Sequence, residues 1–471
     1  MEGSFGPAQT GTPMREALFF VLMGALTIVS VVNARLGILG YVWFSLARPD
    51  MLAFVAGRYP YGEILAGAIL IGSARRLVPM VLNLFGSPFP LFFVIFTAWF
   101  TISARLAWNH DAAMDMLNQF LRISSLVFLI PMLIDTPHHL RLLFLTTAVS
   151  LGFVGVYFGF TAMAHGGLYI YQGVGGSISD NNMMAIALVM AIPFCWFGMQ
   201  MVKPFWFKLM LGSMVFGCVA TIVMTLSRGG FIGMVVVLLL LTLRSRHRII
   251  LLVAVPILLV PPVLLMKDKV TARLSTLSDV QEENSAWSRV EQAQMAFKLI
   301  RHYWWAGVGP GDDNYLDAVE RETGDRPTTI VHSTPLQVLI HLGIPGFILY
   351  VGLFGSCLVS VLRSARRNRL AKTGLDIYGA TLAIALLGFF TAAFVHPRMT
   401  WDFSYMIVMY TASLRLAEKH MAAKATAVEP AAKVLQPAGM PPRAVGPAFG
   451  NVPGGANINR WNPGPAGRLN G

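Results

Sequence analysis

Three residues in separate parts of the chain carry side chains that together suit transfer chemistry. Arg228 stands in TLSRGGF, Arg289 in SAWSRVEQ and His332 in VHSTPLQ. Arginine at the edge of a low-dielectric region binds phosphate well, because its planar guanidinium donates paired hydrogen bonds and stays charged. Two arginines suit a diphosphate, whose negative charge grows as it departs. Neutral imidazole is the usual general base near pH 7, so the histidine suits activation of the attacking group.

Each of these residues also has a structural interpretation. Arg228 would then be an interfacial anchor, and Arg289 would belong to a solvated helix face. His332 would be a capping or hydrogen-bonding residue where a membrane span begins. A place beside a helix N-terminus disfavours imidazolium, which keeps the base form of His332 available. His341 lies inside the predicted span, and we interpret it as structural.

The elements that must position these residues are membrane spans. The chain has 471 residues, of which 55% are hydrophobic and 13% charged, with a mean hydropathy of +0.61. Soluble domains have about 25% charged residues. We predict an all-α polytopic integral membrane protein of about 12 transmembrane helices, because apolar segments near the roughly 20 residues that cross a bilayer recur. The predicted spans are 16–33, 88–107, 115–134, 140–162, 181–201, 205–226, 229–243, 248–266, 335–361, 377–395 and 399–416, with a shorter one near 62–73. We interpret 36–57 as re-entrant or interfacial.

One polar segment, residues 267–334, interrupts the apolar sequence and holds 11 of the 23 acidic residues. A loop this long between spans is usually functional. Basic clusters at 75–76, 203–208, 244–248 and 363–372 fall in short loops, which the positive-inside rule assigns to the cytoplasm. Counting spans from them places the polar segment outside and both termini inside. Arg228, Arg289 and His332 then share the outer face, and the net charge of +13 reports topology rather than nucleic-acid binding.

The predicted organisation has four parts. Residues 1–266 form N-terminal transmembrane helices, 267–334 an external helical subdomain, 335–420 C-terminal transmembrane helices, and 421–471 a disordered tail rich in Ala, Pro and Gly. Within the subdomain, Asn284 and Ser285 are candidate caps of an amphipathic helix over about 285–301. Its apolar positions would be Trp287, Val290 and Phe297. The glycines at 307–311 would end it, and the next span would begin at Ser333-Thr334-Pro335.

Other polar groups allow two interpretations. Asp312 and Asp313 follow the glycine turn, where helix capping is favoured over a metal site because no further acidic cluster stands near by in sequence. The outer loop GVGGSISDNN, 173–182, offers Asp180, Asn181 and Asn182. These side chains suit binding of sugar hydroxyls, and equally an N-cap of the next span. The three cysteines all lie in predicted spans and have neither disulfide nor metal-ligand spacing.

These residues together resemble the signature of the O-antigen ligase and polymerase superfamily. The matching stretch is RLSTL…ENSAWSRVEQAQMAF…AGVGPGDDNY…VHSTPLQVLIHLGIPGF, with Ser-Arg-Gly-Gly at 227–230 as the upstream arginine motif. GVGGSISDNNMMA also resembles exosortase-associated O-glycosylation ligases. The resemblance covers roughly 175–350. His341 stands where relatives often carry an acidic residue, so any role of that acid does not transfer.

The resemblance implies a metal-independent, inverting glycosyltransferase of the GT-C class, without a cofactor, in the bacterial inner membrane. Its donor would be an undecaprenyl-diphosphate-linked glycan and its acceptor a lipid A-core sugar at the periplasmic face. Arg228 and Arg289 would hold the diphosphate, and His332 would activate the acceptor hydroxyl. Asp180, Asn181, Asn182 and Arg273 are further candidates for substrate binding.

Three other functions stay open at this point. An O-linked protein glycosyltransferase or an O-antigen repeat polymerase would use the same donor chemistry. A polysaccharide transporter or flippase is the alternative that is not an enzyme. It should place ionisable residues near the middle of its spans, whereas the predicted spans are nearly free of charge.

Overall fold

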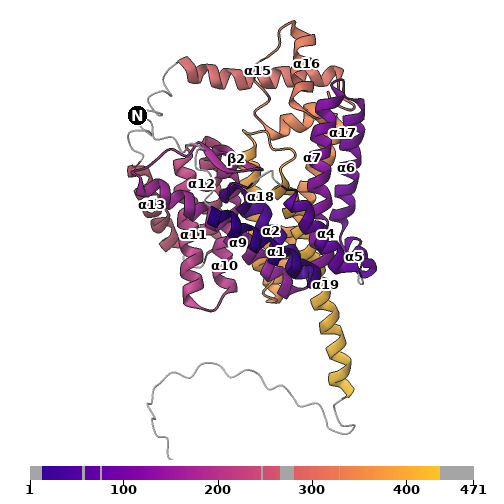
Figure 1. Ribbon diagram of the computed structural model, residues 1–471, viewed down its shortest axis with the longest axis vertical. Helices are drawn as coiled ribbons and strands as arrows, with labels where there is room; N and C mark the ends of the chain where they lie inside the picture. Colours follow the sequence, from indigo (N-terminus) through magenta and orange to yellow (C-terminus); the bar gives the residue numbers. More distant parts are fainter. Residues whose placement is uncertain are drawn as a thin grey trace, which may run out of the picture. The chain divides into compact units, whose positions relative to one another are not determined.

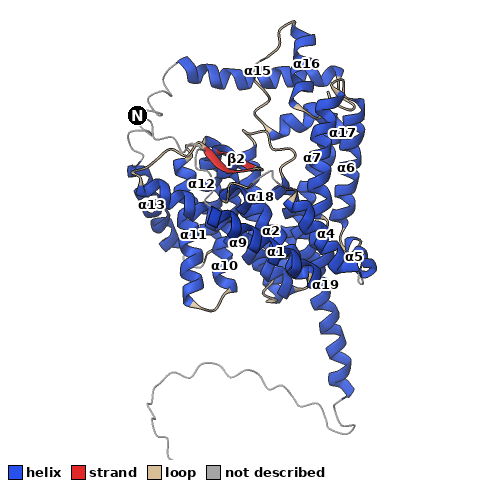
Figure 2. Cartoon of the chain, viewed as in Figure 1, coloured by secondary structure: helices blue, strands red, loops and turns tan. Residues whose placement is uncertain are grey.

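The computed structural model describes residues 13–55, 59–74, 77–245, 248–265, 280–327 and 329–434. Within them the regular structure is helical apart from one short β-hairpin (Figures 1 and 2). The helices before the hairpin are α1 (Pro13–Val32), α2 (Ala34–Ala47), α3 (Pro49–Leu52), α4 (Tyr61–Ser73), α5 (Leu77–Leu84), α6 (Pro88–Leu106), α7 (His110–Val127), α8 (Leu129–Leu133) and α9 (Pro137–Ala164).

The hairpin pairs β1 (Gln172–Gly175) with β2 (Ile178–Asp180) antiparallel, with Gln172 opposite Asp180. The helices after it are α10 (Asn181–Met201), α11 (Phe205–Met224), α12 (Arg228–Arg244), α13 (Arg248–Leu265), α15 (Val280–His302), α16 (Asp312–Thr323), α17 (Thr334–Ala371), α18 (Asp376–Ala393) and α19 (Asp402–Val434). The chain divides into two compact units, residues 1–422 and 423–471.

Among the described residues, eight helices are long and apolar enough to cross a membrane. They are α1, α6, α7 with α8, α9, α10, α11, α17 and α18, and the bent pair α4–α5 would make a ninth. The predicted polytopic helical fold is therefore confirmed, whereas the count of about 12 is not. Two of the predicted segments form helices that are too short to count among these eight. The span predicted at 229–243 is α12, which has 17 residues, and the segment 36–57 contains α2, which has 14.

The helices end at two faces. At one face Arg244 pairs with Asp376 at 3.3 Å, beside a cavity that Gln200, Arg369 and Lys372 also line. We name this the basic face. Helices α10, α12 and α17 end near it, so their first residues lie at the opposite end of the bundle, which we name the site face. The hairpin and the polar segment are at the site face, as the clusters of basic residues predict.

The N-terminal helices differ from the sequence-based topology. Phe19 of α1 packs edge-on against Tyr61 of α4, with ring centroids 5.0 Å apart, and the nearby α3 lies against β1. At the other end of α2, Arg35 pairs with Asp135 at 3.4 Å, just before α9 begins. The Pro13 end of α1 therefore lies at the site face, and its predicted inside position is wrong. The reason is that 36–57 is not re-entrant or interfacial: α2 is buried and connects the two faces.

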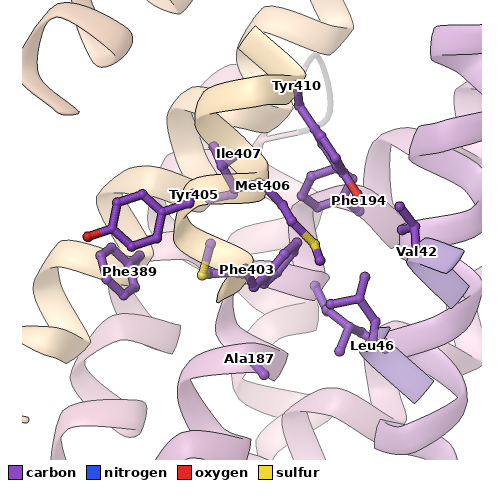
Figure 3. Close-up of a cluster of buried hydrophobic side chains, with 14 of the residues drawn as sticks. Val42, Leu46, Ala187, Phe194, Phe389, Phe403, Tyr405, Met406, Ile407 and Tyr410 are labelled. Atoms are coloured by element: carbon purple, nitrogen blue, oxygen red, sulfur yellow. The ribbon is translucent and has the colours of Figure 1, made fainter. Parts of the chain in front are cut away.

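The core centres on the first half of α19 (Figure 3). Its side chains are buried on every side of the helix, from Phe403 to Leu414. A helix that is apolar all round must lie inside a bundle. Rings from other helices pack on it: Phe93 of α6 lies 5.0 Å from Tyr405, and Phe194 of α10 lies 6.2 Å from Phe403. This core fixes the start of α19, which leads out to the site face.

The helix α17 is broken at Gly343, which has φ +68° and ψ −175°. This left-handed conformation is open to glycine and strained for other residues. A side chain at Gly343 would also lie 2.3 Å from the carbonyl oxygen of Trp305. The amide of Ile344 donates to the carbonyl of Trp304 at 2.8 Å. The segment after α15 therefore packs directly against the break in the membrane helix.

The break leaves helix carbonyls that need new partners, because unpaired backbone groups inside a bilayer are costly. The glycine turn supplies two hydrogen-bond donors for these carbonyls. Val308 N donates to Ile340 O at 2.9 Å, and Gly309 N donates to His341 O at 3.1 Å. Trp99 and Ser103 of α6 supply the others, by donating to Leu342 O and to His341 O. The polar segment thus folds back onto the membrane helices at α17 and α6. His341 is buried at this contact, in agreement with its structural interpretation.

The polar segment is helical, with a small core of its own. Ala296 and Leu299 of α15, Tyr315 and Ala318 of α16, and Val331 are buried together. Figure 1 shows α15 and α16 beyond the ends of α6, α7 and α17. The predicted turn at 307–311 is confirmed, because α15 ends at His302 and Gly307, Gly309 and Gly311 all have positive φ.

Two details of the predicted helix over 285–301 are wrong. Asn284 and Ser285 lie inside α15, which already includes Val280, because a cap contributes only about 1 kcal/mol and the preceding residues also form helix. Phe297 is exposed, and its neighbour Ala296 faces the core instead. The predicted tail from 421 is helical as far as Val434, and 435–471 lie outside the described residues.

Candidate functional site

His332 lies in the short connection between α16 and α17, two residues before α17 begins. Its backbone amide donates to Gln292 Oε1 of α15 at 3.1 Å, and its Nδ1 lies 2.7 Å from the carbonyl oxygen of Ile330. Since a carbonyl only accepts, Nδ1 carries the hydrogen, and a neutral ring keeps its lone pair on Nε2. The side chain is exposed. The imidazole is thus held in one tautomer, in which Nε2 is the basic nitrogen.

Arg289 stands one helical turn before Gln292 in α15. Residues three apart lie on the same face of a helix, so Arg289 is on the side of α15 that meets His332. The side chain of Arg289 is outside the described part, as is the whole of Arg273.

Arg228 is the first residue of α12, and its side chain is exposed. Ser227 caps this helix, because its hydroxyl accepts from Gly230 N at 3.3 Å. Gly229 presses against the connection between α18 and α19: a side chain there would lie 2.9 Å from His396 Nε2. The helix N-terminus adds a partial positive charge beside the guanidinium, so this position favours an anion.

The connection between α18 and α19, residues 394–401, joins the start of α17 to the start of α12. Thr334 Oγ1 donates to His396 O at 2.5 Å and accepts from Arg398 N at 2.9 Å. Gln337 Oε1 accepts from Met399 N at 3.1 Å. Because Thr334 is two residues after His332, these bonds place the candidate base and Arg228 on neighbouring elements of the site face.

Arg398 is a site residue that the sequence analysis did not identify. Its guanidinium Nη2 donates to Asp180 Oδ2 at 3.2 Å, and Nη1 donates to the carbonyl of Pro397 at 2.8 Å. The side chain is 11% exposed. Burial lowers the pKa of Arg398, and the carboxylates of Asp180 and Asp312 oppose that shift. The sequence did contain a signal for Arg398. It is a basic residue in a short loop at the face where few basic residues cluster.

Asp180 is the N-cap of α10, which confirms the capping interpretation: its Oδ1 accepts from Met183 N at 2.8 Å. The other oxygen of this carboxylate binds Arg398. Asn181 donates from its amide to Thr225 O at 3.1 Å and to the hydroxyl of Tyr169 at 3.0 Å. The bond from Asn181 to Thr225 O stabilises the turn that precedes Arg228. Asn182 lies in the same first turn, half-buried.

Asp312 and Asp313 are the first residues of α16, where negative charge complements the helix dipole. The predicted capping role is wrong, because the N-cap is Gly311 and no side chain forms a cap bond there. Partial desolvation and the Asp313 carboxylate raise the pKa of Asp312, while Arg398 and His332 lower it. Asp312 therefore lies within electrostatic range of Arg398 and His332.

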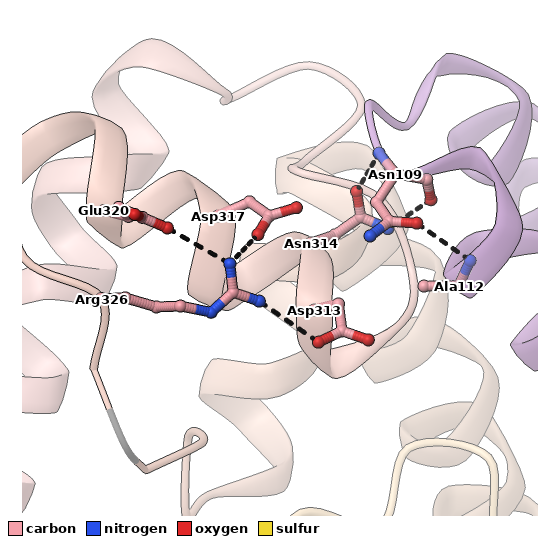
Figure 4. Close-up of polar contacts among 7 residues, drawn as sticks. All are labelled: Asn109, Ala112, Asp313, Asn314, Asp317, Glu320 and Arg326. Carbon is pink, nitrogen blue, oxygen red and sulfur yellow. Dashed lines mark hydrogen bonds and ion pairs between the residues drawn. The ribbon is translucent and has the colours of Figure 1, made fainter.

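The start of α16 is fixed on both sides (Figure 4). Arg326 donates to Asp317 at 2.5 Å, to Glu320 at 3.2 Å and to Asp313 at 3.4 Å. The Asn314 amide donates to Asn109 O at 3.0 Å, and Asn109 N donates back to Asn314 Oδ1 at 2.9 Å. These bonds hold α16 against the first turn of α7, so Asp312 keeps its position beside the site.

Within the described residues, no three His, Cys, Asp or Glu side chains gather as metal ligands would. Metal-independent chemistry stays a prediction. The described side chains at the site include the imidazole of His332, the guanidinium groups of Arg228 and Arg398, and the carboxylates of Asp180 and Asp312. Such a set can accept a proton from a hydroxyl and stabilise negative charge on a leaving group.

The fold and the described side chains define a polytopic helical membrane protein with a cluster of ionisable groups at one face. Residues 213–351 match the family model described as O-Antigen ligase. This match confirms the resemblance to the O-antigen ligase superfamily, and that family implies a membrane glycosyltransferase-like enzyme. The matched residues include Arg228, Arg289 and His332. A search of curated proteins found no match.

Proposed function

We propose that this protein transfers a glycan from undecaprenyl diphosphate to a lipid A-core sugar in the periplasmic leaflet of the bacterial inner membrane. The observation that carries the proposal is the hydrogen bond from His332 Nδ1 to Ile330 O, which leaves Nε2 as a base. The family match supports the reaction class. The basic face supports the orientation, because basic loops stay cytoplasmic and the site would then be periplasmic. The GT-C class and 12 spans remain part of this proposal.

The proposed reaction is one in-line displacement. The acceptor hydroxyl oxygen forms a bond to the anomeric carbon while the bond from that carbon to the diphosphate oxygen breaks. His332 Nε2 takes the hydroxyl proton, and the lipid diphosphate leaves with the bonding electron pair. Attack from the side opposite the leaving group inverts the anomeric configuration. Arg228 and Arg289 stabilise the charge that grows on the diphosphate, where such interactions contribute most to rate.

Substitution of the proposed base tests the mechanism. His332→Ala should abolish transfer in proteoliposomes supplied with lipid-linked glycan and lipid A-core, since general bases contribute about 10²–10⁴-fold. His302→Ala is the matched control, because His302 is an exposed histidine at the end of α15 that bonds Glu322. Full ligation by His332→Ala would show that the mechanism is wrong.

The acceptor needs a separate experiment. Parallel reactions would contain the same donor with purified lipid A-core, with a pilin-like protein, or with no added acceptor. Product in the first supports a ligase, in the second an O-linked protein glycosyltransferase, and in the third a repeat polymerase. Movement of lipid-linked glycan across sealed vesicles without covalent transfer would instead support a transporter or flippase.

A further inference from the structure

A second polar cavity, of about 480 Å³, lies at the site face. Its walls come from α7, from the turn between α2 and α3, from the turn of the hairpin and from the start of α19. Cavities that bind small molecules measure roughly 300–1,000 Å³, so the space suits a small ligand or one part of a larger ligand.

One wall is a polar stripe on α7. Asp115, Asn118, Gln119 and Arg122 all line the cavity, and their spacing places them on one face of the helix. All four are exposed, whereas the opposite face, with Phe120, is buried in the bundle. The helix α7 continues into α8 as a candidate membrane span. Ionisable residues in a span are costly unless they face a water-filled cavity, and they commonly mark a substrate site.

The facing wall holds Arg48 and Asp402 in fixed positions. Arg48 donates to both carboxylate oxygens of Asp50, at 3.0 and 2.8 Å. Asp402 accepts from Phe403 N at 2.8 Å, from the Ser45 hydroxyl at 3.4 Å and from the Ser177 hydroxyl. A carboxylate has about four acceptor positions and a guanidinium five donors, so both groups keep capacity for a ligand.

The charges around the cavity select the class of ligand. Two carboxylates, Asp115 and Asp402, stand with two guanidinium groups, Arg48 and Arg122, and Arg48 is already neutralised by Asp50. The cavity therefore has no excess of positive charge that would select a phosphate. The side-chain amides of Asn118 and Gln119 add further hydrogen-bond donors and acceptors to the lining. A ligand with many hydroxyl groups, each both donor and acceptor, matches this lining.

The cavity borders the candidate site through two shared elements. Trp401 Nε1 donates to Ser177 O of the hairpin turn at 3.0 Å, and Ser177 and Asp402 both line the cavity. The same connection and the same hairpin hold the ion pair between Arg398 and Asp180. We propose that the cavity binds a sugar ring of one of the two substrates, and thereby positions that substrate for transfer. The identity of the substrates rests on the proposed function.

Leucine variants of the two amide residues test the cavity. Asn118→Leu and Gln119→Leu remove hydrogen bonds, and leucine is favourable in a membrane helix, so the fold should persist. Ser125→Ala is the control, because Ser125 is an exposed polar residue of α7 outside the cavity. Transfer by the full-length protein in nanodiscs is measured against donor concentration and then against acceptor concentration. We expect KM for one substrate to rise by about three- to tenfold per variant, with kcat and the other KM within about twofold.

The substrate whose KM rises identifies the source of the sugar. Unchanged KM values for both substrates, in variants that are monodisperse and active, would overturn the proposal. Direct binding separates its failure from that of the proposed function. The probes are the free glycan released from the lipid-linked donor and the free core oligosaccharide released from the acceptor. Weaker binding of one probe to Asn118→Leu supports the cavity even when no transfer occurs, and equal or absent binding by parent and variant counts against it.

Discussion

Arg398 and Asp180 form an ion pair of 3.2 Å although 218 positions separate them in the chain. Asp180 also caps α10, and Arg398 also belongs to the connection that Thr334 holds next to His332. The pair therefore connects the hairpin to the segment that borders both the candidate site and the cavity beside α7. Removing one partner of such a pair leaves the other charge in a poorly solvated place.

The first prediction concerns this pair. Asp180→Asn keeps a good N-cap but removes the charge, so it isolates the ion pair from the capping role. We expect a loss of about 1–3 kcal/mol in stability, because the Arg398 guanidinium stays buried, together with lower transfer activity. Thermal unfolding in nanodiscs measures the first quantity. If the double variant Asp180→Asn/Arg398→Gln is destabilised by the full sum of its single variants, the two residues are not coupled.

The second prediction concerns the break in α17. Gly343→Ala should destabilise the protein by at least about 1–3 kcal/mol, because alanine at φ +68° is strained and its Cβ would meet the Trp305 carbonyl. Gly355→Ala is the matched control in the same helix, where nothing lies within 4 Å of the added carbon. That change should be neutral or stabilise by up to about 1 kcal/mol. Equal melting temperatures for the two variants would contradict the broken helix.

The third prediction concerns pH. Because the pKa of Asp312 is raised in the folded protein, the folded state binds this proton more tightly than the unfolded state. The stabilisation that comes from protonating Asp312 is therefore absent at neutral pH, and it is gained as the pH falls through the pKa of Asp312 in the folded protein. Asp312→Asn removes the effect. The melting temperature of the parent should rise relative to that of Asp312→Asn as the pH is lowered from 7 towards the ordinary carboxyl range. A difference in melting temperature that stays constant with pH would count against a raised pKa of Asp312.

The fourth prediction concerns the diphosphate. Arg228→Lys keeps the charge at the start of α12 but loses the planar fork, so KM for the lipid-linked donor should rise by about tenfold while KM for the acceptor stays constant. Arg105→Lys is the control, because Arg105 is an exposed arginine in the last turn of α6 at the same face. An effect of equal size in the two variants would indicate a general electrostatic role instead of a contact.

Much of the fold could be predicted because its signals are local. Long apolar runs, basic loops and the glycines at 307–311 report helices, faces and a turn without reference to distant residues. The N-terminal topology was not accessible in this way. The helix α2 is only 14 residues long and contains no signal of its direction, so its passage between the faces depends on burial against α1, α4 and α9.

The sequence by itself determined the candidate residues: a histidine at the mouth of a predicted span, and arginines at positions that the predicted topology places on one side. Tertiary structure decided which groups meet. The hydrogen bond from His332 N to Gln292 Oε1 spans 40 positions, and the pair of Arg398 with Asp180 spans 218. The polar stripe of α7 becomes a cavity wall only because Arg48 and Asp402 face it. Contacts of this kind arise from the packing of separate helices, and packing depends on the whole set of buried side chains rather than on any local pattern.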